Sequence, residues 1–334
     1  MATEARALVT GASYGGALTA AGIWSPQVIF DQLSLRNNHM LSVFVSASAC
    51  STVLIYVARR SGYAALPGRS NSSTGRLSGL LGAYDANIVG GLLQGLGMAL
   101  AGACPGSGIV QLALGVEKAT FVLVGGITGA LAYMLVADSL TKRESNVKKT
   151  TVKHTVQDNM EINTETAMAG YEVLLTGALL GLVKFGSSRG PYTITSPVLG
   201  GAAVGLAQAG SIVLAKKTVG ISTAYSEVAA IIGSLAQGHT IKPALNNIVF
   251  AVGLAGGAKL MALALDIRVD QNTGVSTAAA VLGGFVSLFG ARLAGGCTSG
   301  HGISGMSTLS ISSFITMAGL FGGGIIFRQI LNRP

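Results

Sequence analysis

The feature that most constrains this chain is the recurrence of apolar stretches long enough to cross a lipid bilayer. A hydrocarbon core of about 30 Å requires roughly 20 apolar residues in a helix. Stretches of about this length run over residues 7–24, 40–58, 87–103, 118–138, 170–186, 197–215, 246–265, 276–296 and 308–327. The sequence therefore predicts an all-α polytopic membrane protein with about nine transmembrane helices.

The composition points the same way. Charged residues make up 10% of the 334 residues, against about 25% in soluble domains. The 48 glycines are interleaved with Leu, Val, Ile and Ala. Such glycines are typical of transmembrane helices whose backbones approach closely, and they do not indicate a flexible linker. A soluble globular protein of this length is therefore excluded.

The formal net charge of +9 lies mostly between the apolar stretches, as is typical of cytoplasmic loops. The basic residues form no long stripe and aromatic residues are only 6%, so we expect no nucleic-acid partner. Three cysteines are widely spaced without a CxxC or Cys/His pattern. They predict neither a disulfide framework nor a metal site, and nothing indicates a cofactor.

The N-terminus has some features of a signal peptide, because Arg6 precedes an apolar stretch that ends in small residues. Glu4 and the interrupting glycines argue against one. We expect an uncleaved first membrane helix.

Three apolar pieces are too short to span a membrane, and they cover residues 104–116, 228–238 and 297–307. Gly, Pro or polar residues bound them, which is typical of re-entrant or broken helices. Residues 139–169 are polar and lack apolar periodicity, so they predict a solvated cytoplasmic loop. This loop divides the chain into two membrane halves, residues 1–138 and 170–334.

The two halves share a motif. Residues 90–104 (GGLLQGLGMALAGAC) and 283–297 (GGFVSLFGARLAGGC) align without gaps at an offset of 193, with seven of fifteen positions identical. Basic residues around Arg59 and Lys142 predict that the second and fourth loops are cytoplasmic. The helix before Cys104 then runs outward and the helix before Cys297 inward. We therefore expect two pseudo-symmetric inverted halves, a transporter architecture, although Arg328 would lie outside.

Each shared motif ends in a cysteine and a glycine-rich break before a second apolar segment. Such a break exposes backbone N–H groups that attract anions, together with the positive end of a helix dipole. Inside a membrane, irregular backbone is tolerated only where it is buried or lines a polar cavity. The two turns are therefore the predicted substrate path. The candidate residues are Cys104, Pro105, Gly106, Ser107, Cys297, Thr298, Ser299, Gly300, His301 and Ser304, with Arg292 as a further candidate near Cys297.

Structural roles compete with these assignments. A membrane cysteine is usually a small packing residue, which is the simpler reading for Cys50. His301 fits a backbone cap as well as a substrate contact. Arg292 and Lys259 are costly cations within apolar stretches, and each could be functional or reach an interface. Glu227 could pair with a neighbouring lysine or bind a coupling proton.

At the two turns the sequence resembles the YeeE/YedE sulphur transport family. The similar segments are GLGMALAGACPGSGIVQLALG (95–115), LAGGCTSGHGISG (293–305) and GALTAAGIWSPQVI (16–29). The resemblance implies a thiosulfate importer of the plasma (inner) membrane with an inverted-repeat helical fold. It also implies a path on which successive cysteines contact the sulphur of the anion. A cytoplasmic sulphur-handling partner would fit such an importer, but nothing in the chain identifies it.

The chain departs from this family at a third path cysteine. The comparable stretch, VGISTAYSE (219–227), carries Ile221 and Ser222 instead of a thiol, and Cys50 is the remaining cysteine. Three functions therefore stay open: a transporter of thiosulfate or a similar sulphur anion, a membrane thiol enzyme such as a sulfurtransferase or disulfide oxidoreductase, and a transporter of a sulphur-free anion. We expect the first of these functions, and we expect no enzymatic activity.

Overall fold

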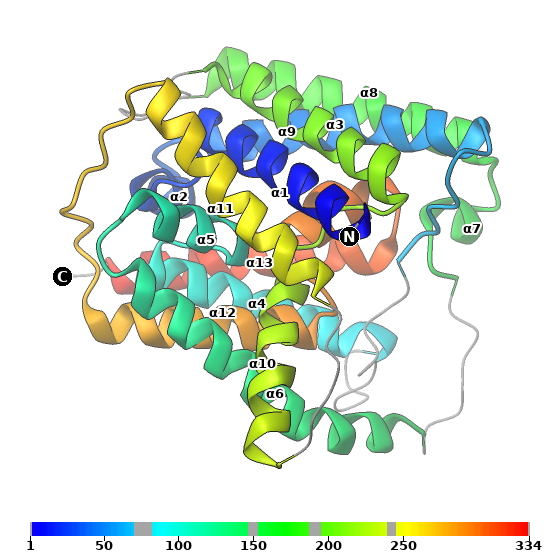
Figure 1. Ribbon diagram of the computed structural model, residues 1–334. Helices are drawn as coiled ribbons and strands as arrows, with labels where there is room; N and C mark the ends of the chain where they lie inside the picture. Colours follow the sequence, from blue (N-terminus) through cyan, green and yellow to red (C-terminus); the bar gives the residue numbers. More distant parts are fainter. Residues whose placement is uncertain (1, 70–81, 146–152, 187–194, 239–244, 333–334) are drawn as a thin grey trace.

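A computed structural model describes residues 2–69, 82–145, 153–186, 195–238 and 245–332. In these ranges the chain is helical, with an isolated β-bridge between Thr155 and Ser310 and no β-sheet. The α-helices are α1 (Ala2–Ala20), α2 (Pro26–Leu33), α3 (His39–Arg60), α4 (Asp85–Ala101), α5 (Pro105–Leu114), α6 (Ala119–Ser145), α7 (Val156–Met160), α8 (Thr164–Phe185), α9 (Pro197–Ala215), α10 (Ser222–Ala236), α11 (Asn246–Ala264), α12 (Thr277–Leu293) and α13 (Ile311–Leu331). A 3₁₀ turn, η1 (Gly82–Tyr84), precedes α4, and a π-helical segment, η2 (Ser299–Gly305), follows α12 (Figure 1).

Seven helical stretches of the described chain are long and apolar enough to cross a membrane. They are α3, α6, α8, α9, α11, α13 and the continuous stretch from η1 through α5. The predicted all-α polytopic membrane protein is therefore confirmed, with seven such stretches where the sequence predicted about nine. The shortfall lies in α12, which has 17 residues, and in α1, whose first turns carry Glu4 and Arg6.

Side chains are distributed as in a protein surrounded by lipid. Large apolar side chains face outward on the long helices; for example, Leu135 is 80% exposed and Phe185 is 84% exposed. Conversely, Asn87, Gln94 and Gln208 are fully buried near the centre of the molecule. Such exposed apolar area is stable only against lipid or a partner, and buried amides need hydrogen bonds inside the bundle.

Glycines bring four pairs of parallel helices into backbone contact. In the α1–α11 pair, Gly11 faces Phe250 and Gly15 faces Leu254, so the two helices run parallel. An added Cβ at Gly15 would overlap the Leu254 backbone, and such small residues four apart are typical of close membrane helix pairs. The other parallel pairs follow the same pattern: α3 with α9 (Val43 by Gly201, Cys50 by Gly205), α4 with α13 (Gly91 by Thr316, Gly95 by Leu320) and α6 with α12 (Gly125 by Val281, Gly129 by Phe285).

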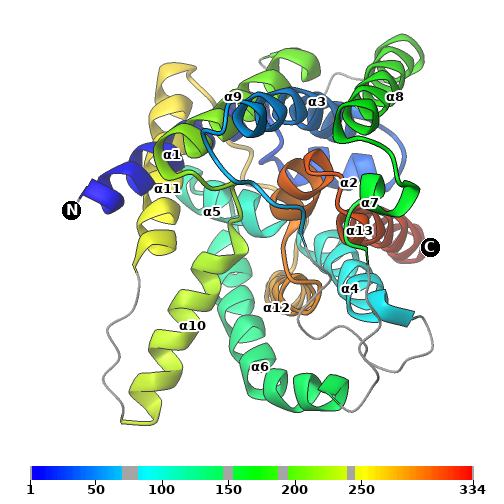
Figure 2. The ribbon, with the colours of Figure 1, turned by 90° about the vertical axis from the view of Figure 1, so that its right-hand side faces the viewer.

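Helices α4 and α12 carry the shared motif, and they pack against each other in opposite directions. Gly90 faces Gly290 and Ala294, whereas Gly97 faces Gly283 and Ser287. At the offset of 193, Gly90 corresponds to Gly283 and Gly97 to Gly290. The contact is therefore reciprocal: Gly90 meets Gly290, and its counterpart Gly283 meets Gly97. In Figure 2, α12 is seen end-on beneath the row formed by α1, α3 and α9.

The predicted polar loop at 139–169 contains more structure than a solvated linker. Helix α6 continues to Ser145, α7 occupies Val156–Met160 and α8 begins at Thr164. The backbone N–H of Val156 donates to Leu309 O at 2.9 Å, and that of Ile311 donates to His154 O at 3.0 Å. This segment is thus attached to the chain between η2 and α13. Residues 146–152 lie outside the described residues.

Candidate functional site

The first cysteine turn joins α4 to α5. Gly102 ends α4 in a left-handed conformation (φ 61°), and Pro105 occupies the first turn of α5, each in its favoured place. Cys104 is the N-cap: its Sγ accepts the N–H of Ser107 at 3.3 Å, while Ser107 Oγ accepts the N–H of Cys104 at 2.8 Å. This reciprocal pair is a capping box in which a thiol replaces the usual hydroxyl.

The second turn repeats this relation after α12. The chain reverses at Gly295 (φ 82°) and continues from Cys297 into η2. The Cys297 thiol accepts the backbone N–H of Gly300, three residues further on, as the Cys104 thiol does with Ser107. Cys297 Sγ also lies 3.3 Å from Ser299 Oγ. Short π-helical segments occur frequently at functional sites.

Buried polar side chains fix the first turn from neighbouring elements. Gln111 Nε2 donates to Trp24 O and Gly102 O, both at 2.8 Å, and so joins α5 to the ends of α1 and α4. The Tyr225 hydroxyl of α10 donates to Pro105 O at 2.9 Å. Because each bond reaches a main-chain carbonyl, the turn is held by its backbone, and none of these bonds uses the Cys104 thiol.

The second turn is held in a similar way. The hydroxyl of Thr298 donates to Gln94 Oε1 on α4 at 3.1 Å. His301 Nε2 lies 3.2 Å from Ala294 O and its Nδ1 lies 2.9 Å from Ser313 Oγ. A carbonyl only accepts, so Nε2 carries the proton and Nδ1 of a neutral ring accepts from the serine. His301 is thus a cap for the end of α12, the structural alternative expected for it.

Ser304 joins η2 to the turn before α10. Its hydroxyl donates to Val219 O at 2.8 Å and accepts from Gln208 Nε2 at 2.9 Å, and Gln208 Oε1 accepts the N–H of Val219 at 3.1 Å. Gln208 therefore fixes the second turn from α9, in the way that Gln111 fixes the first.

A small cavity of about 20 Å³ lies between the two turns. A space of this size holds about one water molecule. Cys297 adjoins it through its contact with Ser299. The cavity is lined by Cys104, Gly106, Ser107 and Ser299 from the turns, and by Tyr14, Leu18, Ile23, Trp24, Ile29, Met40, Phe44, Ile221 and Ile303.

A serine at the start of α10 adjoins the second turn. Ser222, the first residue of α10, hydrogen-bonds the Cys297 thiol through its backbone and its side chain. Cys50 lies elsewhere, on α3 against Gly205 of α9. Ser222 is therefore at the site, whereas Cys50 belongs to a helix contact.

Arg292 does not line the cavity that sequence spacing assigned to it. Its guanidinium lies 6.0 Å from the ring centre of Tyr133 on α6. Lys259 is exposed on α11. The Glu227 carboxylate accepts the backbone N–H groups of Asn247 and Ile248 at 3.1 and 3.0 Å, so it caps the start of α11.

Arg69 is a residue at this site that the sequence did not indicate. Its backbone N–H donates to Ser310 Oγ at 2.6 Å, and its guanidinium lies over Gly296 and Gly300 and donates to Gly295 O at 3.4 Å. No ion pair within the described chain engages it. Burial lowers the pKa of Arg69, but an arginine stays protonated at neutral pH. A fixed positive charge therefore adjoins the Cys297 turn.

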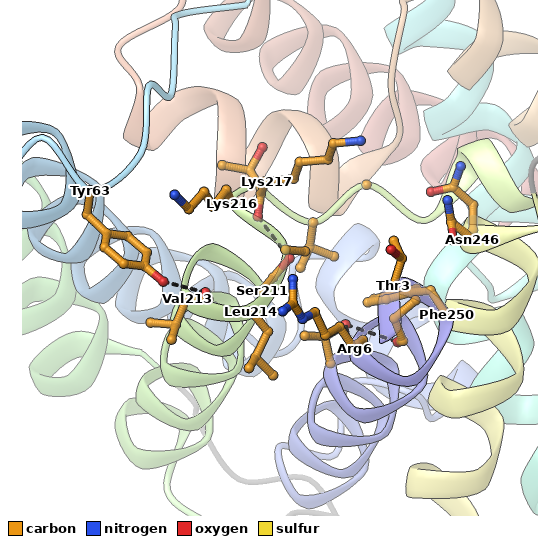
Figure 3. A pocket seen from close by; sticks show the side chains of 17 residues that line it. Thr3, Arg6, Tyr63, Ser211, Val213, Leu214, Lys216, Lys217, Asn246 and Phe250 are labelled. Atoms are coloured by element: carbon orange, nitrogen blue, oxygen red, sulfur yellow. Dashed lines mark hydrogen bonds between the residues drawn. The ribbon is translucent and has the colours of Figure 1, made fainter. Parts of the chain in front are cut away.

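A large open pocket lies beside this cation (Figure 3). It measures about 610 Å³, and its described lining includes Arg6, Lys216 and Lys217 but no carboxylate. Its wall also includes Gly220, which approaches the Arg69 guanidinium. Lys216 and Lys217 follow the end of α9, and Arg6 lies on α1. We call this pocket the basic vestibule.

Neither a disulfide bond nor a candidate metal cluster occurs among the described residues. Cys50, Cys104 and Cys297 are all free thiols. The described residues contain no cluster of three or more His, Cys, Asp or Glu side chains that could hold a metal ion.

Comparisons with known proteins agree with the resemblance at the turns. Two relatives described as "Probable transporter", from Xylella fastidiosa strains Temecula1 and 9a5c, are 34% and 32% identical over 122 residues. The match covers 36% of this chain and 83% of each relative, so each is less than half as long as this chain. Residues 21–326, which include both cysteine turns, match the family described as "Sulphur transport". This chain therefore belongs to the sulphur transport family.

Proposed function

We propose that this protein imports thiosulfate or a similar small sulphur-containing anion along a path marked by Cys104 and Cys297. The observation that supports this most is the pair of cysteine turns that meet at one small cavity, each with a thiol that accepts a backbone N–H from three residues further on. Each turn presents a thiol beside backbone N–H groups and a serine hydroxyl, Ser107 in one and Ser299 in the other. The family match favours transport over the alternative of a membrane thiol enzyme.

The chemistry of a thiol suits this cargo. The terminal sulphur of thiosulfate is large and polarizable and accepts hydrogen bonds weakly, and a neutral thiol is a weak donor. Conduction requires contacts favourable enough to admit an ion and weak enough to release it. Two thiols in succession supply such contacts, whereas N–H groups and hydroxyls meet the oxyanion end.

We further propose that the two halves form an inverted repeat. The reciprocal antiparallel contact of α4 with α12 supports it. The other helix pairs support it too. Exchanging the two halves turns the α1–α11 pair into the α9–α3 pair, and the α4–α13 pair into the α12–α6 pair. The two Xylella relatives are each less than half as long as this chain, which supports one membrane half as the repeating unit. The polar interval 139–169 would then join the halves on one side.

The basic vestibule is proposed as the cytoplasmic mouth of the path. Helix α3 ends at Arg59 and Arg60 and runs parallel to α9, so Lys216 and Lys217 lie on the same side. Basic residues concentrate on the cytoplasmic side of a plasma membrane. Arg69 would then stand between the vestibule and Cys297, and it would hold the anion before release.

Uptake of radiolabelled thiosulfate tests this function in cells that lack their own thiosulfate importers. Cells that express this chain should accumulate the label, and excess unlabelled thiosulfate should abolish the signal, whereas equal sulfate or phosphate should leave most of it. Equal competition by sulfate would mean that the path carries a sulphur-free oxyanion as readily. Absence of uptake despite normal membrane expression would refute the function.

A further inference from the structure

Tyr14 is a buried residue that takes no part in holding either cysteine turn. Its side chain on α1 is fully buried (0% exposed), and its hydroxyl has no hydrogen-bond partner among the described residues. Buried hydroxyls nearly always have a partner, because an unpaired one loses its bonds to water without replacement. A phenylalanine would fill the same space without that cost.

The position of this hydroxyl is informative. Tyr14 lines the small cavity together with Cys104, Ser107 and Ser299. It lies close enough to the thiols of Cys104 and Cys297 to interact electrostatically with both. The unpaired donor therefore adjoins the space between the two cysteine turns.

The packing of α1 prevents Tyr14 from withdrawing. The adjacent Gly15 brings the α1 backbone into contact with Leu254 of α11. The Tyr14 ring packs against Phe250, with ring centres 6.4 Å apart. The hydroxyl is thus held at the cavity by the helix pair, and its unpaired state is fixed by the fold.

We propose that the Tyr14 hydroxyl donates a hydrogen bond to an oxygen of the transported anion as it passes between Cys104 and Cys297. The site would then recognise anions with two unlike ends: an oxyanion end bound by Tyr14 and a soft sulphur end bound by the thiols. This inference rests on the proposed function. The cavity of about 20 Å³ is smaller than such an anion, so flexible lining side chains, Met40 among them, must move to admit it.

The test compares Tyr14→Phe with wild type as purified protein in lipid vesicles. Loss of one hydrogen bond to a charged ligand should raise the KM for thiosulfate by about tenfold or more. The Tm without substrate should stay the same or rise, because the change removes an unpaired buried hydroxyl. The rise in Tm that thiosulfate gives the wild type should shrink in the variant. Tyr133→Phe is the matched control, because Tyr133 is also buried (7% exposed) but packs against Phe289 and Arg292.

The outcomes separate this inference from the proposed function. Wild-type KM and an unchanged thiosulfate-dependent Tm in Tyr14→Phe would overturn the donor role while leaving thiosulfate transport intact. A lowered substrate-free Tm would also overturn it, because the hydroxyl would then have a structural partner. If the wild type itself carried no thiosulfate, the proposed function would fail and this inference with it.

Discussion

At the scale of single residues, Cys104 has a structural role that separates from its proposed contact with substrate. Its thiol accepts the N–H of Ser107 and caps α5. Cys297 has the same relation to Gly300, but there the following segment is a π-helix. A substitution can therefore weaken the turn, the substrate contact or both, and stability must be measured beside uptake.

The cap predicts a difference between two substitutions. Cys104→Ala removes the acceptor for Ser107 N–H and should lower the free energy of unfolding by about 1 kcal/mol. Cys104→Ser supplies a better acceptor and should leave stability unchanged or raise it slightly. Thermal unfolding of the purified variants in detergent measures both. If serine destabilised as much as alanine, the volume of the sulphur atom, and not the cap, would hold the turn.

The residues of the turns could be predicted from sequence because they follow one another in it. Cys104, Gly106, Ser107 and Ser299 all line the cavity. Arg292 was expected there from its five-residue spacing to Cys297, but the chain reverses at Gly295, where helical spacing no longer applies.

Other site residues carry no such sequence signal. Tyr14 and Arg69 reach the turns from distant segments, so only tertiary packing brings them there. Gln94 lies within an apolar helix, and its buried amide could have been noticed as costly in a membrane.

At the scale of elements, the glycine contact between α4 and α12 holds the two turns in register. Gly97 meets the backbone of Gly283 and Ser287. Gly97→Leu should overpack this contact and destabilise the protein by about 1–3 kcal/mol, because a well-packed interface has no room for added methylenes. Thermal unfolding in detergent measures the loss.

A matched control lies on α13. A Cβ added at Gly322 meets no described atom within 4 Å, so Gly322→Leu should leave the Tm near that of wild type. Equal Tm values for the two variants would contradict the close packing of α4 against α12.

The elements were predictable where apolar length decides them, and less so elsewhere. The long apolar runs became helices, and residues 105–114 formed a short one after a break, as expected. The expected short piece at 228–238 lies mostly within α10, which begins six residues earlier. The π-helical form of η2, which packs against α3 and α13, has no signature in apolar periodicity.

At the scale of the whole molecule, the proposed inverted repeat predicts which side of the membrane each loop faces. Because α6 and α12 run parallel, the loop before α12 lies opposite the polar interval that follows α6. Asn159 and Asn272 are exposed residues of these two segments. In intact cells, a membrane-impermeant maleimide should label Asn272→Cys, whereas it should label Asn159→Cys only after permeabilisation.

Wild type is the control for this labelling, since it carries three native thiols. Labelling of both variants from the same side would contradict the inverted arrangement. The reverse pattern would keep the arrangement but turn the protein over in the membrane, which would put the basic vestibule outside.

The central claim is that a sulphur anion passes both thiols, and uptake by single-cysteine variants tests it most directly. Purified wild type, Cys104→Ala, Cys297→Ala and the control Cys50→Ala would be compared in vesicles for radiolabelled thiosulfate uptake per inserted protein. Cys50 contacts Gly205 between α3 and α9, away from the cavity, so its loss should have a small effect. Loss of Cys104 or Cys297 should lower uptake about tenfold or more, the equivalent of about 1.4 kcal/mol. Wild-type uptake by both Cys104→Ala and Cys297→Ala would contradict the account, because the thiols would then be packing residues.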